Sequence, residues 1–193
     1  MEHHIQLPLT REKTVKIKSG DTIYLTGVIY TARDAAHKRF IELIREGKKL
    51  PFPIEDAVIY YVGPTPAKPG QVIGSAGPTT SSRMDVYAPE LLQLGLRGMI
   101  GKGKRSKEVV DAMKEAKAIY FAAIGGAGVL LANCIKTCEA IAFEDLGPEA
   151  VHKLTVEEFP VVAIIDTTGE NLYEIGRKSY LENLESLCDQ QHI

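Results

Sequence analysis

Hydrophobic residues recur at helical spacing in several separate parts of the chain. Within residues 34–46, Ala36 and Phe40 fall on one face while charged side chains occupy the other. Asp34 is placed to cap this helix and Gly47 to end it. The same pattern predicts helices over residues 34–46, 107–116, 129–137 and 179–188, and a further one beginning near Pro89.

Other segments alternate between apolar and polar residues or are continuously apolar, which is typical of strands. Residues 13–30 alternate and are interrupted by a turn composition at 19–21, so two strands are expected there. The run at 118–126 has the pattern of a strand that is covered on both sides. Further strands are predicted at 57–63, 72–74, 99–100, 140–143 and 161–165. The mixture, without an internal repeat, predicts a single compact α/β domain over residues 1–193.

The composition narrows the class of protein. Of the 193 residues, 45% are hydrophobic and 25% are charged, as in an ordinary soluble globular protein. The formal net charge of -2 gives no electrostatic reason to expect nucleic acid or an anionic membrane as a partner. No apolar run approaches the roughly 18–20 residues of a membrane-spanning helix, and the N-terminus lacks the apolar core of a signal peptide. A cytoplasmic location is therefore expected.

The three cysteines do not form a recognisable metal site. Cys134 and Cys138 are separated by three residues, which would place them on one face of the predicted helix, and Cys188 stands far from both. The paired CxxC spacing of zinc sites is missing. Reduced, structural thiols are expected, and no metal ligand is assigned.

Two glycine-rich stretches resemble nucleotide-binding loops but depart from them at decisive positions. GMIGKGKR (98–105) matches GxxxxGK, yet Arg105 stands where a phosphate loop needs Ser or Thr for magnesium. GGAG (125–128) lacks the GxGxxG spacing and is explained by a tight turn between a strand and a helix. Nucleotide binding is not expected.

Three cations stand at strand ends or in loops, where side chains can converge on a cleft. They are Arg33, Arg83 and Lys102. Guanidinium groups bind carboxylates bidentately, and hydrogen bonds to charged groups contribute roughly 1.5–3 kcal/mol each. Together the three could bind a small dicarboxylate, although each alone is typical of a surface charge.

The loop SAGPTTSSRMD (75–85) places four hydroxyl side chains directly before Arg83. A Gly-Pro pair constrains the backbone and presents Thr79 and Thr80, whose hydroxyls can donate and accept hydrogen bonds. A threonine needs neighbouring cations or a carboxylate to stabilise its deprotonated form before it can transfer a proton. The alternative is a group of residues that caps the following helix.

His37 lies one helical turn after Arg33, in RDAAH (33–37). This spacing would let its imidazole orient Arg33 or Asp34 through a hydrogen bond. The alternative is a partly buried helix histidine without such a role.

Four of these segments together resemble a known family. TARDAAHKR (31–39), GPTTSSRMD (77–85), MIGKGKRS (99–106) and IGGAGVLLA (124–132) are similar, in that order, to the C-terminal region of class I iron–sulfur fumarases. They are equally similar to the beta subunit of two-subunit fumarases and of L-tartrate dehydratase. Segments 139–147 and 156–169 also fit, so the resemblance covers nearly the whole chain.

The resemblance implies that this chain is half of a hydro-lyase. In that family a [4Fe–4S] cluster is held by three cysteines of an alpha part, and the beta part is a swivelling β/β/α domain that closes over it. An alpha subunit is therefore the expected partner, in an assembly with two copies of each subunit. None of the three cysteines of this chain matches the cluster ligands.

Residue roles follow from the matching positions. Arg33, Arg83 and Lys102 would bind the substrate carboxylates. Thr79 would be the proton-transfer candidate, and Thr80 would line the same pocket. Asp34 and His37 are assigned supporting roles.

The reaction that the resemblance favours is the interconversion of (S)-malate and fumarate. Ser82 and Lys104 replace a Gly and an Asn of the familiar single-chain enzymes, which weakens the choice between fumarate and tartrate. Dehydration of L-tartrate is the nearest alternative. An alternative of another class is a stand-alone domain that binds dicarboxylates without catalysis.

Overall fold

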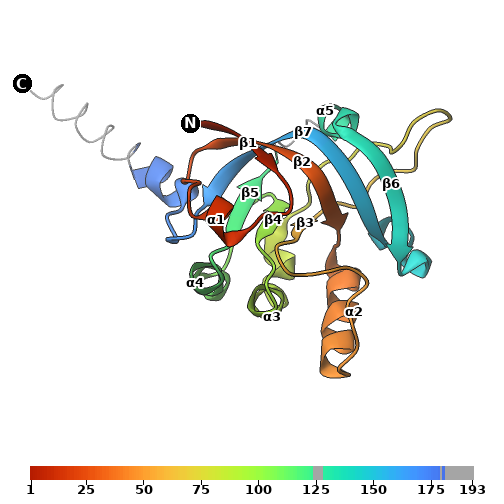
Figure 1. Ribbon diagram of the computed structural model, residues 1–193, viewed down its shortest axis with the longest axis horizontal. Helices are drawn as coiled ribbons and strands as arrows, with labels where there is room; N and C mark the ends of the chain where they lie inside the picture. Colours follow the sequence, from red (N-terminus) through yellow and green to blue (C-terminus); the bar gives the residue numbers. More distant parts are fainter. Residues whose placement is uncertain (124–127, 179, 181–193) are drawn as a thin grey trace, which may run out of the picture.

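The computed structural model describes residues 1–123, 128–178 and 180. Seven strands form one sheet in the order β1-β2-β3-β4-β5-β7-β6 (Figure 1). The strands are β1 (Glu2–Gln6), β2 (Thr22–Thr31), β3 (Val58–Tyr60), β4 (Gly98–Gly101), β5 (Ile119–Ala122), β6 (Ile135–Ala142) and β7 (Val151–Ile165). The helices are α1 (Arg11–Thr14), α2 (Asp34–Arg45), η1 (Ser81–Met84), α3 (Ala88–Gln93), α4 (Lys107–Ala116), α5 (Gly128–Asn133) and η2 (Glu144–Glu149).

Strand pairing gives the sheet its curvature. Strands β1 to β5 run parallel to one another, whereas β7 pairs antiparallel with β2, β5 and β6. Because β7 joins both β2 and β5, the pairings close into a ring through β2, β3, β4, β5 and β7. The α/β fold class predicted from the sequence is confirmed, while the swivelling motion stays a prediction.

Alternating residues of the central strands separate two hydrophobic cores. Tyr60 and Ile100 belong to a core shared with β2 and β7, whereas Ile59 and Met99, on the opposite face, pack with the helices α2, α3 and α4. Figure 1 shows these three helices together on one side of the sheet. The architecture is therefore layered, with strands on one side of β3–β5 and helices on the other.

The two ends of helix α2 test the predicted N-cap and the predicted C-terminal glycine. Its N-cap is Arg33 rather than Asp34, which is the first helical residue, so the predicted capping role of Asp34 is wrong. At the other end, Gly47 has a φ of +66°. The N–H groups of Gly47 and Lys48 donate to Ile44 and Leu43 (3.0 and 2.8 Å), which satisfies two terminal carbonyls. The predicted C-terminal glycine is confirmed.

Two predicted strands are absent. Residues 13–18 contain the end of α1 and a turn, because Thr14 and Ile17 both point inward, three residues apart, while Val15 is exposed. The strand that pairs here with β2 is β1, at the N-terminus. Residues 72–74 form part of a loop, because Thr65 bonds the backbone of Gly74 and Ser75 and closes residues 65–75 on themselves.

The helix predicted over residues 129–137 is shorter in the structure, because a strand begins within that range. Helix α5 ends at Asn133, and β6 begins at the buried Ile135, which pairs with Val156 of β7. Cys138 is therefore in a strand, and the expectation that Cys134 and Cys138 share a helix face is wrong. Strand β7 starts ten residues before the predicted 161–165. The predicted helix at 179–188 lies almost wholly outside the described residues.

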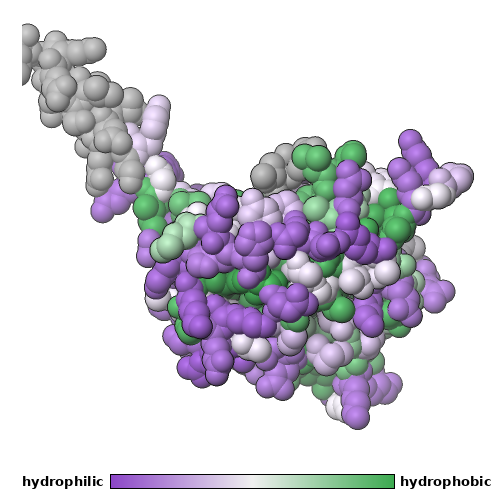
Figure 2. All heavy atoms as spheres, turned by 45° about the horizontal axis from the view of Figure 1, so that its top comes forward, coloured by the Kyte–Doolittle hydropathy of each residue, from purple (hydrophilic) through white to green (hydrophobic). Residues whose placement is uncertain are grey.

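Figure 2 shows a mostly polar surface with hydrophobic atoms gathered near the top of the view, around α5. Val129 and Leu130 of this helix are 68% and 67% exposed. No helix among the described residues is long and apolar enough to cross a membrane.

Candidate functional site

The candidate site forms where three parallel strands end. Arg33 follows β2 by two residues, and Lys102 follows β4 directly. The Thr79 N–H donates to the carbonyl of Tyr61, one residue after β3, at 2.8 Å. Because β2, β3 and β4 are neighbours that run in the same direction, their carboxyl ends bring these distant segments to one edge of the sheet.

Backbone hydrogen bonds join the hydroxyl-rich loop to the lysine loop. The Lys102 N–H donates to the Thr79 carbonyl at 3.2 Å, and the Ser81 N–H donates to the Lys102 carbonyl at 2.9 Å. Thr80 and Lys102 thus form an isolated parallel bridge. Both side chains are exposed, and Lys102 forms no ion pair with a described residue.

A continuous chain of polar contacts connects the remaining predicted residues. Arg83 donates from Nη2 to Thr79 Oγ1 at 2.5 Å, and its Nη1 lies 3.2 Å from Asp34 Oδ2. The same Asp34 oxygen is 3.7 Å from Arg33 Nη2, which lies 3.3 Å from Glu149 Oε1. Asp34 therefore stands between the two guanidinium groups. We call Arg33, Arg83, Lys102, Thr79 and Asp34 the cationic cluster.

The cationic cluster is open to solvent. The side chain of Arg83 is 45% exposed, and those of Arg33 and Asp34 are 23% and 34% exposed. The two guanidinium groups have two carboxylates beside them, those of Asp34 and Glu149, and the Lys102 ammonium adds a third positive charge, so the site can attract further negative charge. The structure brings the predicted residues together, and their roles in binding or catalysis stay predictions.

His37 is fully buried beneath the cluster. Its Nδ1 lies 2.8 Å from the Arg33 carbonyl, and Nε2 has no hydrogen-bond partner among the described residues. Burial lowers the pKa of His37 to about 4, and the positive charge of Arg105 adds to this effect. The imidazole is therefore neutral at pH 7. Because a carbonyl can only accept, Nδ1 carries the proton and orients the backbone of Arg33.

The buried histidine makes stability depend on pH. In the unfolded chain His37 protonates below about pH 6.5, whereas in the folded chain it stays neutral down to about pH 4. Protons therefore favour the unfolded state in this window, and stability falls by about 3 kcal/mol as the pH drops from 6.5 to 4. Chemical denaturation of wild type and His37→Asn at several pH values measures this difference. If the free energy of unfolding changes with pH equally in wild type and His37→Asn, burial of His37 is not the cause of the pH dependence.

Sequence reasoning missed a buried ion pair beneath the two loops. The side chain of Arg105 is 0% exposed, and its Nε donates to Asp85 Oδ1 at 2.6 Å. The other oxygen of Asp85 accepts from the Ser106 N–H at 2.6 Å. The guanidinium lies 5.4 and 5.2 Å from the ring centroids of Tyr61 and Tyr120. This pair ties the end of η1, which carries Arg83, to the segment after Lys102.

A hydroxyl relay supports the same junction. Ser81 Oγ and the Tyr120 hydroxyl are 2.9 Å apart, and the Tyr120 hydroxyl donates to the Gly103 carbonyl at 2.9 Å. Gly101 is required where these elements meet, because a Cβ there would lie 2.0 Å from Ser81 Oγ. Ser81 belongs to the hydroxyl run that the sequence analysis singled out, whereas nothing in the sequence distinguishes Tyr120 from the other apolar residues of its strand.

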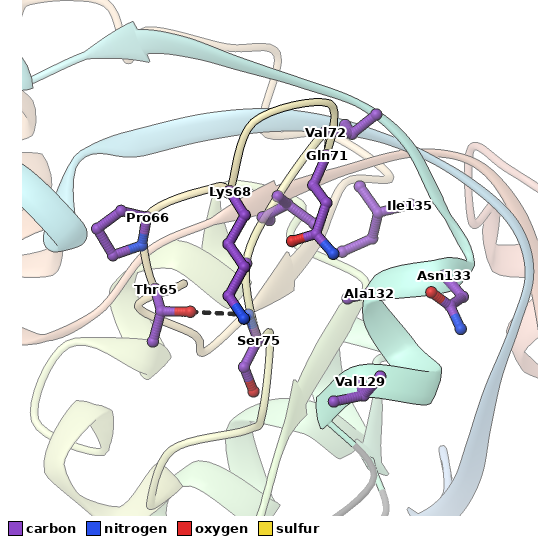
Figure 3. A pocket seen from close by; sticks show the side chains of 12 residues that line it. Thr65, Pro66, Lys68, Gln71, Val72, Ser75, Val129, Ala132, Asn133 and Ile135 are labelled. Atoms are coloured by element: carbon purple, nitrogen blue, oxygen red, sulfur yellow. Dashed lines mark hydrogen bonds between the residues drawn. The ribbon is translucent and has the colours of Figure 1, made fainter.

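Several hollows of the described surface are lined by residues outside the cationic cluster. One, with a volume of about 540 Å³, is lined by the 65–75 loop, α5 and Ile135 (Figure 3). Its polar lining residues are mostly uncharged, with Lys68 as the one cation. A dianion is therefore better recognised by the paired guanidinium groups than by this hollow.

The described residues contain no group of three or more His, Cys, Asp or Glu side chains placed to hold a metal ion. The thiols of Cys134 and Cys138 have pKa values raised by burial, which disfavours the thiolate that binds metals. Of the glycine-rich stretch at 125–128, residues 125–127 lie outside the described residues. Its last residue, Gly128, packs so closely that a Cβ would lie 2.5 Å from Ser75 Oγ.

Comparison with known proteins identifies the family. A family model described as the fumarase C-terminus matches residues 1–176. The chain belongs to this family. A Methanocaldococcus jannaschii protein, provisionally named L(+)-tartrate dehydratase subunit beta, is 40% identical over 185 residues, which are 93% of this chain and 95% of that protein.

Fumarate hydratases are similar over part of their length. The anaerobic class I fumarate hydratase of Escherichia coli is 44% identical over 153 residues, covering 78% of this chain and 28% of that protein. Fumarate hydratase 2 of Leishmania major is 39% identical over 166 residues, covering 84% and 29%. The chain thus spans less than a third of these two enzymes, and the predicted family resemblance is confirmed.

Proposed function

We propose that this chain is the beta-type part of a hydro-lyase that acts on a four-carbon dicarboxylate, with (S)-malate and fumarate as the first substrates to test. The observation that carries the proposal is the contact chain from Thr79 through Arg83 and Asp34 to Arg33, with Lys102 beside it. Two guanidinium groups, an ammonium group and a hydroxyl are the groups that recognition of two carboxylates and a proton transfer would use.

The guanidinium groups of Arg33 and Arg83 would each bind a substrate carboxylate, with the exposed Lys102 ammonium as a third donor. Removal of the proton next to a carboxylate builds negative charge on that group. Cations fixed by the fold stabilise this charge more in the transition state than in the ground state. The cluster would therefore contribute to turnover as well as to binding.

Thr79 is the proton-transfer candidate. Its Oγ1 accepts a hydrogen bond from Arg83 Nη2, so a guanidinium lies where it would stabilise a developing negative charge on that oxygen. The Thr79 hydroxyl proton is not used by this contact, since the guanidinium is the donor. In the hydration direction the same group would return a proton to carbon.

The second half of the site would come from an alpha partner. In this proposal that partner holds a [4Fe–4S] cluster, which supplies Lewis-acid chemistry for the departing or entering hydroxide. The open position of the cationic cluster suits a surface that is completed by another subunit, closing over the substrate and excluding water. Two copies of each subunit remain the expected assembly.

L-Tartrate is a second candidate substrate. It is favoured by the M. jannaschii protein, whose name gives that activity and which matches this chain over 95% of its own length. Fumarate and malate are favoured by similarity to fumarate hydratases from several organisms. Tartrate carries one hydroxyl more than malate, and the same cationic cluster would accommodate it.

Purification with the alpha partner and an assay with both substrates test the proposal. The complex is expected to interconvert malate and fumarate, and the chain alone is expected to do neither. If the complex turns over tartrate but not malate, L-tartrate would be the substrate in place of malate and fumarate. If the purified chain binds dicarboxylates unaided and captures no iron–sulfur protein, the stand-alone binding domain would be the better description.

A further inference from the structure

One carboxylate outside the predicted site contacts both the start of α2 and the guanidinium of Arg33. The N-cap residue of α2 makes no side-chain hydrogen bond to the helix. Instead Glu149 Oε2 accepts from the Ala35 N–H at 3.1 Å, although the two residues are 114 positions apart. The other oxygen, Oε1, lies 3.3 Å from Arg33 Nη2. Glu149 therefore holds a helix terminus and a substrate-binding candidate at the same time.

The contacts around Arg33 make Glu149 the residue that orients the Arg33 guanidinium. On one side the side chain packs against Gly63, where an added Cβ would lie 2.8 Å from Nη1. Arg33 Nε is buried and has no hydrogen-bond partner among the described residues. At Nη2, the Glu149 oxygen at 3.3 Å is nearer than that of Asp34 at 3.7 Å.

Glu149 is itself held in place. It is the last residue of η2, and η2 is fastened to α2 by a bidentate pair in which Arg39 donates to both oxygens of Asp145, at 2.8 and 2.5 Å. The Ala150 N–H donates to the Gly147 carbonyl at 2.9 Å and closes the turn. A fixed carboxylate of this kind restricts the rotamers of a long, flexible side chain.

We propose that Glu149 is a positioning residue that fixes the guanidinium of Arg33 for bidentate contact with a substrate carboxylate. The identity of that substrate rests on the proposed function, whereas the orientation of Arg33 by Glu149 does not. A bidentate contact depends on the direction of the guanidinium plane, so a free rotor would bind less well even with its charge unchanged. Removing the Glu149 charge also removes repulsion of a dianion, but solvent at this partly exposed site screens that gain.

Glu149→Ala in the complex with the alpha partner tests the proposal, with Asp145→Ala as the matched control. Both substitutions loosen η2 from α2, but only Glu149 contacts Arg33. Glu149→Ala is expected to raise KM for the dicarboxylate about tenfold, with a smaller change in kcat. The ratio to wild type should be the same at low and high salt. Asp145→Ala should change KM much less than Glu149→Ala, because the contacts of Glu149 with Ala35 and Arg33 remain. A KM that is unchanged or lowered by Glu149→Ala would overturn the proposal.

A double-mutant cycle separates positioning from a general loss of structure. Arg33→Lys removes the planar fork, so adding Glu149→Ala to it should change kcat/KM less than threefold. Effects that simply multiply would assign Glu149 a structural role only.

Nitrogen-15 NMR of the free chain provides a readout that does not need turnover. The Arg33 Nε–H signal should exchange slowly in wild type and Asp145→Ala, and faster in Glu149→Ala. An unchanged signal in Glu149→Ala would refute the orientation of Arg33 by Glu149. Absence of lyase activity in the wild-type complex would refute the proposed function and leave this result standing.

Discussion

Thr79→Val is expected to lower kcat of the reconstituted enzyme about 10²–10⁴-fold, the usual contribution of a general acid–base group. Valine has nearly the shape of threonine and lacks the hydroxyl that accepts from Arg83 Nη2. The backbone contacts of Thr79 with Tyr61 and Lys102 do not involve the side chain, so the loop should keep its position. Steady-state kinetics of the complex with malate and fumarate measure the effect.

Thr79→Ser and Thr80→Val are the matched variants for this experiment. Serine keeps a hydroxyl at the same position and should retain most of the activity. Thr80 is exposed, and its side chain forms no hydrogen bond with either guanidinium of the described cluster, so Thr80→Val should affect KM more than kcat. If Thr79→Val turns over at the rate of wild type, Thr79 is not the proton-transfer group.

The sequence indicated that the cations of the cationic cluster stand at strand ends or in loops, where side chains can converge, but their convergence depends on the strand order of the folded sheet. Arg33 and Lys102 each come shortly after a strand, and parallel strands deliver such residues to one edge. Thr79 reaches the same edge through the hydrogen bond of its N–H to Tyr61. The family resemblance named the same residues independently. Their mutual contacts through Asp34 were not predictable, because side-chain pairing depends on loop geometry.

Long-range and buried polar partners escaped the sequence reasoning for a physical reason. Glu149 meets Ala35 and Arg33 only because η2 folds against α2, and no local pattern records this contact. Arg105 entered the sequence analysis only as the residue that departs from a phosphate-loop motif, yet its side chain is fully buried. Burial of a charge is decided by the partner that the fold supplies, here Asp85.

The strand errors have a similar origin. Strand β7 pairs with β2 and β6 at its start, and it contains Pro160, which interrupts the strand pattern in the sequence. In β6, Ile135 follows directly on residues with helical composition, so only the tertiary pairing with Val156 sets the boundary. Local propensity is overridden where the sheet offers a place for a strand.

Asp85→Asn is expected to destabilise the fold by about 3–5 kcal/mol, because it leaves the buried guanidinium of Arg105 without its counter-ion. That loss is a large fraction of the roughly 5–15 kcal/mol that stabilises a typical domain. Urea denaturation of the purified chain measures it as a lowered midpoint. The change should also free the loops that carry Arg83 and Lys102, since the Ser106 N–H loses a charged acceptor.

Two further variants distinguish burial of the charge from its removal. Asp111→Asn breaks the exposed pair with Lys107 and should leave the midpoint unchanged, because solvent already screens that pair. Replacing both members of the buried pair, with Asp85→Leu and Arg105→Met, should recover much of the stability that Asp85→Asn loses. The double variant should nevertheless bind substrate poorly, since no ion pair then joins η1 to the Lys102 loop. A midpoint in Asp85→Asn equal to that of Asp111→Asn would show that Arg105 finds solvent or another partner when Asp85 is neutralised.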